Sequence, residues 1–238
     1  MTEPVLEAVD VVQFLGRGAG RVQALKGVSL SLRGGELVLL MGPSGSGKTT
    51  LLSVMGCLMT PASGIVRVGG QPIAGTDPEA LARLRRDHIG FIFQSYHLFP
   101  TLTAEENVRL ALDVRGQRSR HTVKAARDVL GMVGLAHKRK SFPLELSGGE
   151  QQRVAIARAI VGQTQAILAD EPTGALDAEN GQAIMTLLAK IAKDQSRAVL
   201  VVTHDPRILP FADRIVHIED GRIVNEESGS PAKKVSMS

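Results

Sequence analysis

The stretch "ELVLLMGPSGSGKTT", from Glu36 to Thr50, decides the fold. The run from Glu36 to Met41 is apolar without alternation, as in a central strand that is buried on both faces. The chain then enters a glycine-rich loop, and from Lys48 onward it has helical character. A buried strand, a glycine loop and a helix start, in this order, predict a phosphate site at the edge of an α/β sheet.

The loop matches the pattern G-x-x-x-x-G-K-[ST], which is typical of a P-loop. Its glycines permit a loop whose N–H groups point inward at a phosphate chain, and Lys48 adds a charge for the β- and γ-phosphates. The Thr49 hydroxyl can ligate Mg²⁺. The alternative is a flexible Gly/Ser linker, which the flanking strand and helix argue against. The residues expected to bind the nucleotide here are Gly42, Pro43, Ser44, Gly45, Ser46, Gly47, Lys48, Thr49 and Thr50.

A P-loop needs a second acidic metal anchor on a neighbouring strand, and "AILADEPTG" supplies one. We expect Asp170, at the strand end, to hold Mg²⁺ through water, and Glu171 to orient the attacking water. The alternative is a pair of solvated acids at a strand end. His204 follows the next apolar run and is interpreted as a γ-phosphate contact, although a lone strand-end His is usually structural. Gln94 closes "GFIFQ" and is expected to touch Mg²⁺ or the attacking water.

A second helix start with anion-binding character lies far downstream, in "ELSGGEQQRVAIARA". Ser147 with Glu150 three residues later is a capping-box pattern. Gly148 and Gly149 let a ligand approach the backbone closely, and the free N–H groups of a helix start attract anions. A plain capped helix would explain Ser147 and Glu150 but not the glycines. The chain therefore has two predicted phosphate sites.

Composition narrows the class of protein. Apolar residues make up 43% and charged residues 22% of the 238 residues, which is the ordinary globular mix. No apolar run approaches the roughly 20 residues that span a bilayer, and we expect no secretion signal at the N-terminus. The lone Cys57 excludes an internal disulfide and is expected to be a buried thiol. A net charge of +4 suits an anionic surface, but one Tyr, six Phe and no Trp offer little for base stacking, so we expect no nucleic-acid partner.

The order of predicted strands and helices indicates an α/β protein with a mostly parallel sheet. Short strands fill the first forty residues, with another strand pair in "GIVRVGGQPI". We predict a single domain over residues 5–225. Its α/β core, with an N-terminal antiparallel β subdomain, takes 1–94 and 161–225. An α-helical subdomain is inserted at 95–160, and 226–238 form a flexible tail.

Taken together, these motifs resemble those of ABC-type ATPase subunits. The P-loop, Gln94, "LSGGEQQR", "ILADEPT", "GALD" and "VTHD" occur in that family's order, and the match runs from about Val5 to Val224. The resemblance implies hydrolysis of ATP to ADP and phosphate with Mg²⁺. It also implies a head-to-tail homodimer in which each ATP lies between the P-loop of one subunit and the LSGGE helix start of the other. Asp177, in "GALD", would lie along that interface.

The family usually stacks the adenine base on an aromatic residue ahead of the second strand. Phe14, directly before the stretch "LGRGAGR", is the candidate here, and a core Phe is the alternative. The resemblance also implies a separate membrane permease, which we expect to dock near residues 95–107. Tyr96, Leu98 and Phe99 would then be exposed apolar contacts, and a place in the subdomain core is the alternative for each.

The stretches "HLFPTLTAEENV" and "ADRIVHIEDGRIV" look most like the branch of lipoprotein-release, macrolide and heterocyst-glycolipid exporters. We expect the subunit to work at the cytoplasmic face of the inner membrane and to drive export of a lipid-like, lipoprotein or hydrophobic substrate. A second hypothesis is that the same ATP clamp regulates an envelope enzyme without transport. A soluble nucleic-acid ATPase is disfavoured by the composition and by a helical insert without a long heptad run.

Overall fold

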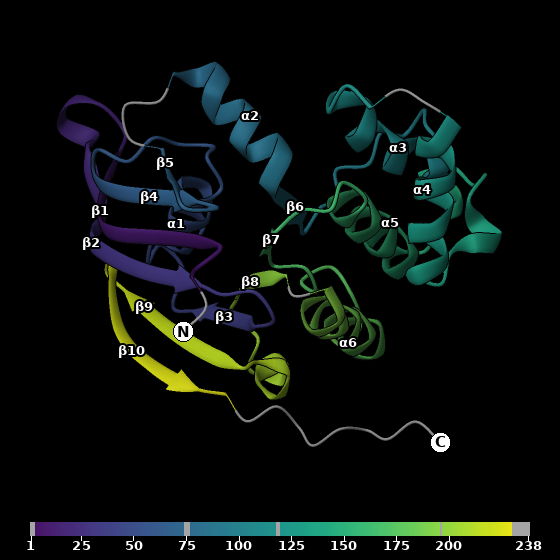
Figure 1. Cartoon of the computed structure of the whole chain (residues 1–238). Coiled ribbons are helices and arrows are strands. Elements are labelled where there is room, and N and C mark those ends of the chain that lie inside the picture. Colours follow the sequence, from purple (N-terminus) through teal and green to yellow (C-terminus); the bar gives the residue numbers. More distant parts are fainter. Residues whose placement is uncertain (1–2, 74–76, 118–119, 196, 230–238) are drawn as a thin grey trace.

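A computed structural model describes residues 3–73, 77–117, 120–195 and 197–229. The fold has two sheets and a group of helices to one side of them (Figure 1). Within the described ranges, no helix combines the length and the apolar character that crossing a bilayer requires.

The six-stranded sheet carries the sequence patterns that decide the fold. Its order is β10-β9-β3-β8-β7-β6, and all neighbours pair in parallel except β10 with β9. The strands are β3 (Leu37–Met41), β6 (Ile89–Phe93), β7 (Ala166–Asp170), β8 (Ala198–Thr203), β9 (Arg214–Glu219) and β10 (Arg222–Ser228). The predicted mostly parallel α/β sheet is confirmed.

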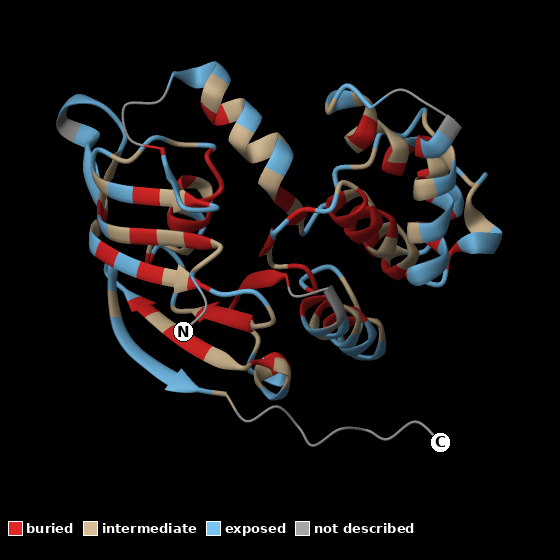
Figure 2. Ribbon diagram, in the orientation of Figure 1, coloured by how far each residue is buried: buried red, intermediate tan, exposed pale blue. Residues whose placement is uncertain are grey.

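The central strands are buried on both faces, which explains their unbroken apolar runs. Along β3, Leu37 and Leu39 pack into one hydrophobic core, whereas Val38 and Leu40 pack into the other. The first core lies under the helices drawn to the right in Figure 1, and the second fills the space around α1 (Lys48–Met55). Figure 2 shows the resulting band of buried residues through the sheets.

The four-stranded antiparallel sheet has the order β2-β1-β4-β5 and packs on the second core. Its strands are β1 (Leu6–Leu15), β2 (Val22–Leu32), β4 (Ser63–Val68) and β5 (Gln71–Pro72). Strand β1 changes register against β2 at three places, the last of them between Gln13 and Phe14. Each bulge of this kind changes which side chains face the core.

The remaining helices are α2 (Pro78–His88), α3 (Ala104–Val114), α4 (Arg120–Met132), α5 (Gly148–Ile160) and α6 (Ala178–Gln195). Helices α3, α4 and α5 share the first core, and α6 covers the same face of the sheet. The division into a core and a helical subdomain at 95–160 stays a prediction. Helix α2 and strands β9 and β10 had not been predicted.

The predicted tail from 226 to 238 is wrong for its first residues. Glu226 to Ser228 belong to β10 and pair with β9, and the Glu226 carboxylate binds Arg214 at 2.8 Å. These backbone and side-chain bonds hold the segment in the sheet. Residues 230–238 lie outside the described residues.

Candidate nucleotide-binding site

The glycine loop follows a path that side chains would block. Gly47 precedes α1 with φ at +103°, and a Cβ there would lie 2.6 Å from the Ala24 carbonyl oxygen. A Cβ at Gly42 would lie 2.0 Å from the Ile218 carbonyl oxygen. Since real Cβ atoms do not approach oxygen this closely, the loop requires glycine at both positions.

The donors of the loop have few partners within the chain. The Lys48 Nζ atom donates to the carbonyl oxygens of Gly42 and Pro43 at 2.7 Å each. Within the described ranges, the backbone N–H groups of Gly45 and Gly47 donate to no backbone carbonyl. The first N–H groups of α1 also lack intrahelical partners, as at every helix start. A polyanion such as a triphosphate fits this cradle of free donors.

The acidic pair lies at the same sheet edge as the loop. Asp170 ends β7 and aligns with Val202 of β8, which in turn aligns with Leu40 of β3. Burial raises the pKa of Asp170, and the charge of Glu171 acts in the same direction. A hydrogen bond with the Thr49 side chain and the charge of Lys48 oppose this rise in the pKa. Hydroxyl and carboxylate oxygens are the hard ligands that suit Mg²⁺, so the Thr49 hydroxyl and the Asp170 carboxylate together fit that ion.

Glu171 is held in a strained position next to His204. Its φ is +48°, which is uncommon for a residue with a side chain, and its N–H donates to the Val202 carbonyl oxygen at 3.0 Å. The His204 Nδ1 atom lies 2.7 Å from the Glu171 Oε1 atom. Strain of this kind persists only where the surroundings hold it, and it is concentrated at functional sites. Glu171 lines the same pocket as the glycine loop.

A pocket of about 660 Å³ joins these groups. It is lined by loop residues, by the carboxylates with His204 and Gln94, and by residues of β1, β2 and the β9–β10 turn: Leu15, Val22, Gln23, Ala24, Ser44, Gly45, Gly47, Lys48, Thr49, Thr50, Gln94, Asp170, Glu171, Val202, His204, Asp220 and Gly221. The structure thus gathers Gln94, Asp170, Glu171 and His204 around the loop, as the motifs predicted.

Phe14 is not among the residues that line this pocket. Its ring is covered by the Arg21 guanidinium, whose central carbon lies 4.0 Å from the ring centroid. The neighbouring Leu15 lines the pocket instead, together with Val22, and both are exposed. The base contact at Phe14 stays a prediction, and the side chains of Leu15 and Val22 are a second apolar surface, at the pocket itself, that a base could contact.

The turn between β9 and β10 also lines the pocket and was not predicted from the sequence. Asp220 and Gly221 both have positive φ, as in a two-residue hairpin turn. The Gly221 N–H donates to the Ser46 carbonyl oxygen at 3.0 Å, and the Lys26 N–H donates to the Gly221 carbonyl oxygen at 2.8 Å. The turn thus ties the glycine loop to β2. An Asp-Gly pair between apolar runs was the signal that could have revealed it.

The second predicted phosphate site lies apart from this pocket. The Ser147 Oγ atom accepts from the Glu150 N–H at 3.3 Å, and the Ser147 N–H donates to the Glu150 carboxylate at 2.8 Å, so the predicted capping box is confirmed. The hydrogen bond from the Ser147 N–H lowers the pKa of Glu150. None of Ser147, Gly148 and Gly149 lines the pocket of the glycine loop. The two helix starts that are predicted to bind phosphate are therefore separate in the chain.

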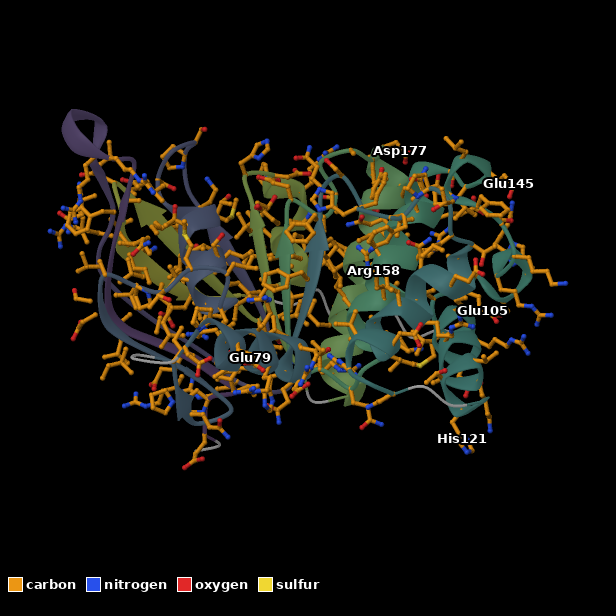
Figure 3. All side chains as sticks on the ribbon, turned by 90° about the horizontal axis from the view of Figure 1, so that it is seen from above. Glu79, Glu105, His121, Glu145, Arg158 and Asp177 are labelled. Carbon is orange, nitrogen blue, oxygen red and sulfur yellow. The ribbon has the colours of Figure 1, made fainter. Side chains whose placement is uncertain are left out.

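Asp177 caps α6 beside this second site. Its carboxylate accepts from the Asn180 N–H at 2.9 Å and from the Asn180 side-chain amide at 2.7 Å. The bond from the Asn180 N–H is the main reason why the pKa of Asp177 is low. A Cβ at Gly149 would lie 2.6 Å from the Asn180 Oδ1 atom, so the starts of α5 and α6 are in contact. Asp177 and Glu145 lie along the same edge in Figure 3.

Comparison with known proteins identifies the family to which these motifs belong. Residues 25–174 match the family model described as ABC transporter. The macrolide export ATP-binding/permease proteins MacB of Shigella flexneri and Escherichia coli K12 are each 46% identical over 221 residues, which is 93% of this chain. The chain spans 34% of the length of these curated relatives.

Solved structures agree in fold. A dimeric post-hydrolysis state of the ATP-binding cassette MJ0796, bound to ADP and Pi, matches with a TM-score of 0.85 and 42% identity, over 94% of this chain and 98% of that one. The cbiO1 subunit of the Clostridium perfringens ABC transporter complex cbiONQ matches with a TM-score of 0.84 and 26% identity, over 97% and 90% of the two chains. The chain therefore belongs to the ABC transporter family, as one of its ATPase domains.

Proposed function

We propose that this ATPase domain closes as a head-to-tail homodimer on ATP and drives a membrane permease of the exporter branch from the cytoplasmic face of the inner membrane. The single observation that carries the dimer is the separation of two anion-binding helix starts in one chain. The dimeric structures of MJ0796 and the names of the MacB relatives support it. By that analogy, the substrate is hydrophobic: a macrolide-like molecule, a lipid or a lipoprotein.

In this proposal the glycine loop and Lys48 hold the triphosphate of ATP. The Thr49 hydroxyl, Asp170 through water, and Gln94 nearby would hold Mg²⁺, which would neutralise charge on the phosphate oxygens. Glu171 accepts a hydrogen bond from the attacking water and aligns it with the γ-phosphate. His204, 2.7 Å from the Glu171 carboxylate, holds that carboxylate in place and lies within reach of the γ-phosphate.

The start of α5 completes the site of the other subunit. Ser147, Gly148 and Gly149 present a hydroxyl and free N–H groups, which suit the γ-phosphate of an ATP bound to the partner's loop. Closure is then favoured only when ATP is present, because a ligand stabilises the state that binds it better. Asp177, in contact with α5 through Asn180, lies along the same interface.

The base in this site packs between aliphatic side chains. Leu15 and Val22 are 37% and 64% exposed at the pocket rim, so their apolar surface is free to cover a purine ring. Contacts of this kind bury apolar surface but make no hydrogen bonds with the edge of the base, so they discriminate weakly between adenine and guanine.

We predict that Leu15→Ala weakens ATP binding about three- to tenfold, because the lost contact with the base is worth about 1 kcal/mol. Phe14→Ala is the matched control, since it removes a larger side chain from the adjacent position of the same strand. Fluorescent-nucleotide titration of both variants measures the affinities. If Phe14→Ala weakens binding and Leu15→Ala does not, the base lies on the other face of β1.

A groove between the sheet and the helices is the proposed docking site of the permease. It encloses about 550 Å³ and is lined mainly by apolar and basic residues: Ala82, Arg85, Arg86, Ile89, Gly90, Phe91, Phe93, Phe99, Leu110, Ala111, Val114, Arg115, Arg158 and Ala159. Phe99 and Val114 are 50% and 62% exposed. A cytoplasmic helix with apolar and acidic side chains complements this lining.

Tyr96, Leu98 and Phe99, which were expected as exposed contacts of the permease, differ from one another in exposure. Phe99 is exposed in the groove, whereas Leu98 packs against the first hydrophobic core and Tyr96 is half-buried. The role of Asn107 was not predicted from the sequence: its side chain is fully buried and holds the loop that carries Phe99. Its side-chain amide donates to the Phe99, Leu102 and Thr103 carbonyl oxygens, and its Oδ1 atom accepts from the Phe99 N–H at 2.8 Å.

We predict that Phe99→Glu lowers recovery of the permease at least tenfold when the tagged chain is purified from detergent-solubilised membranes with ATP, because it places a charge in the apolar contact. Val224→Glu, at an equally exposed position on β10, is the matched control and should not change recovery. The protein recovered with the unaltered chain identifies the permease by mass spectrometry. Recovery of nucleic acid, or of the ATPase dimer alone, would contradict the transport proposal.

A further inference from the structure

A further pocket, of about 470 Å³, lies at the sheet edge opposite the nucleotide site. Its walls come from residues 3–5, the β4–β5 turn at Gly69 and Gly70, residues 163–165, and Arg197. We call it the amino-edge pocket, because two of these segments directly precede the paired first residues of β7 and β8. The length of β7, about 16 Å, separates this edge from the acidic pair. None of its residues lines the nucleotide pocket.

Backbone hydrogen bonds hold the walls of the amino-edge pocket together. The Gly69 N–H donates to the Val5 carbonyl oxygen at 2.8 Å, and the Ala198 N–H donates to the Gln165 carbonyl oxygen at 3.0 Å. A Cβ at Gly69 would lie 3.2 Å from the Gln165 Oε1 atom, so the β4–β5 turn lies against the segment before β7. The pocket is therefore formed by segments that are fixed to one another.

The Arg197 side chain is buried at this pocket, with one nitrogen left over. It is 8% exposed. Its Nε atom donates to the Thr164 carbonyl oxygen at 2.7 Å, and its Nη2 atom donates to the Ile160 carbonyl oxygen at 3.2 Å. The Nη1 atom is buried as well and has no hydrogen-bond partner within the described ranges. A buried donor without an acceptor is costly, and more so on a charged group.

The charge of Arg197 is not offset by an acid. In the part of the chain that the structure describes, its guanidinium forms no ion pair. Burial lowers the pKa of Arg197. The alternative to a ligand site is a cap on α5, since Ile160 ends that helix and a cation suits its carboxyl end. A cap explains the bond of Nη2 but leaves Nη1 without a role.

Two backbone donors line the same pocket. Across the described ranges, the N–H groups of Gly70 and Thr164 make no hydrogen bond with another backbone group. A Cβ at Gly70 would meet nothing within 4 Å, so there is open space beside the turn. A guanidinium and backbone N–H groups are donors that suit phosphate. Because a phosphate group has three acceptor oxygens in a tetrahedral arrangement, it can accept from several walls at once.

We propose that the amino-edge pocket binds a phosphate group, with the Arg197 Nη1 atom as its charged contact. Two ligands share this chemistry: free phosphate, which ATP hydrolysis releases, and a small phosphate monoester. Glu3 is an exposed acid at the pocket and opposes an anion there. The inference does not depend on the proposed dimer, because all of these groups belong to one chain.

Titration of the full chain with inorganic phosphate at constant ionic strength, followed by amide NMR, tests this site. The amide signals of Gly70 and Thr164 report on the amino-edge pocket. Those of Gly45 and Gly47 report on the glycine loop of the same molecule, so binding at the two places is measured separately. Glycerol phosphate serves as the phosphate monoester, and acetate serves as a carboxylate for comparison.

Arg197→Met keeps the length of the side chain and removes its charge. Phosphate binding at Gly70 and Thr164 should weaken at least about tenfold, because a hydrogen bond from a charged donor is lost. Binding at the glycine loop should stay unchanged. Arg158→Met is the matched control: Arg158 also has its pKa lowered by burial and donates to two carbonyl groups, but it does not line the pocket. It should keep phosphate binding, and melting temperatures show that both variants are folded.

Gln163→Glu tests the site without altering the buried cation, since Gln163 is exposed and lines the pocket. The added charge should weaken phosphate binding about two- to threefold, and Glu3→Gln should strengthen it by a similar factor. If Arg197→Met does not fold, unchanged binding in Gln163→Glu overturns the inference.

Three results with folded variants would also overturn it. Phosphate might leave the signals of Gly70 and Thr164 in place, Arg197→Met might bind phosphate as well as the unaltered chain, or acetate might bind more tightly than phosphate. If the site exists, tighter binding of glycerol phosphate identifies a monoester as its ligand, and equal or weaker binding identifies free phosphate.

Discussion

Glu171→Gln should hydrolyse ATP about 10²- to 10³-fold more slowly than the unaltered chain, which is the typical contribution of a positioned general base. The substitution keeps the size and shape of the side chain but removes the charge that attracts the proton of the attacking water. The residues that hold the triphosphate are unchanged, so the affinity for ATP should stay the same. With binding intact and hydrolysis slow, the protein should accumulate as a closed dimer.

Single-turnover hydrolysis and size-exclusion chromatography with ATP measure the two parts of this expectation. Glu219→Gln is the matched control, because Glu219 is an exposed acid at the end of β9 and does not line the pocket. Its turnover should equal that of the unaltered chain. If Glu171→Gln turned over normally, another group would have to orient the water, and His204 would be the first candidate because it already contacts Glu171.

The parts of the site that the sequence predicted correctly depend on local patterns. Strands β3, β7 and β8 are unbroken apolar runs because both of their faces are buried, and their carboxyl ends must share one sheet edge. Ser147 and Glu150 are close in sequence, so their reciprocal bonds could be predicted without knowledge of the fold. Residue type and short spacing were enough for these elements.

The parts that were missed depend on distant segments. Leu15 lines the nucleotide pocket and the adjacent Phe14 does not, because neighbouring side chains of a strand face opposite sides and the pairing of β1 with β2 decides which side faces the pocket. Helix α2 is strongly polar and has one buried residue, Leu81, so it has few apolar positions by which it could be predicted. Arg158 donates hydrogen bonds to carbonyl groups about sixty residues earlier in the chain, which only the fold brings near.

Ser147→Arg should abolish ATP-dependent dimerisation and lower turnover about 10²-fold or more, the typical effect of removing a group that stabilises the transition state. A long cation at the start of α5 would collide with the partner's glycine loop and its lysine. Ser147 does not line the pocket of its own chain, so the monomer should bind ATP with unchanged affinity. Light scattering with ATP, in the Glu171→Gln background, measures the dimer.

The substitution also removes a helix cap, which costs about 1 kcal/mol, and a second capping box separates the two effects. Thr103 and Glu106 cap α3 with the same reciprocal bonds as Ser147 and Glu150 cap α5. Thr103→Arg should therefore lower the melting temperature about as much as Ser147→Arg while leaving ATP-dependent dimerisation intact. Equal loss of the dimer in both variants would show that helix stability, and not contact with the partner's ATP, is responsible.

Mixing two inactive variants tests the shared site directly. Lys48→Ala damages the glycine loop, and Ser147→Arg damages the opposite half of the site, so each homodimer has no intact site. In a mixed dimer, one site combines the intact glycine loop of the Ser147→Arg chain with the intact α5 start of the Lys48→Ala chain. The other site contains both substitutions. Hydrolysis should therefore reappear on mixing, because a site shared between two chains needs only one sound half from each. If each chain carried a complete site by itself, mixing would restore nothing, and the two helix starts would have to bind the same nucleotide within one subunit.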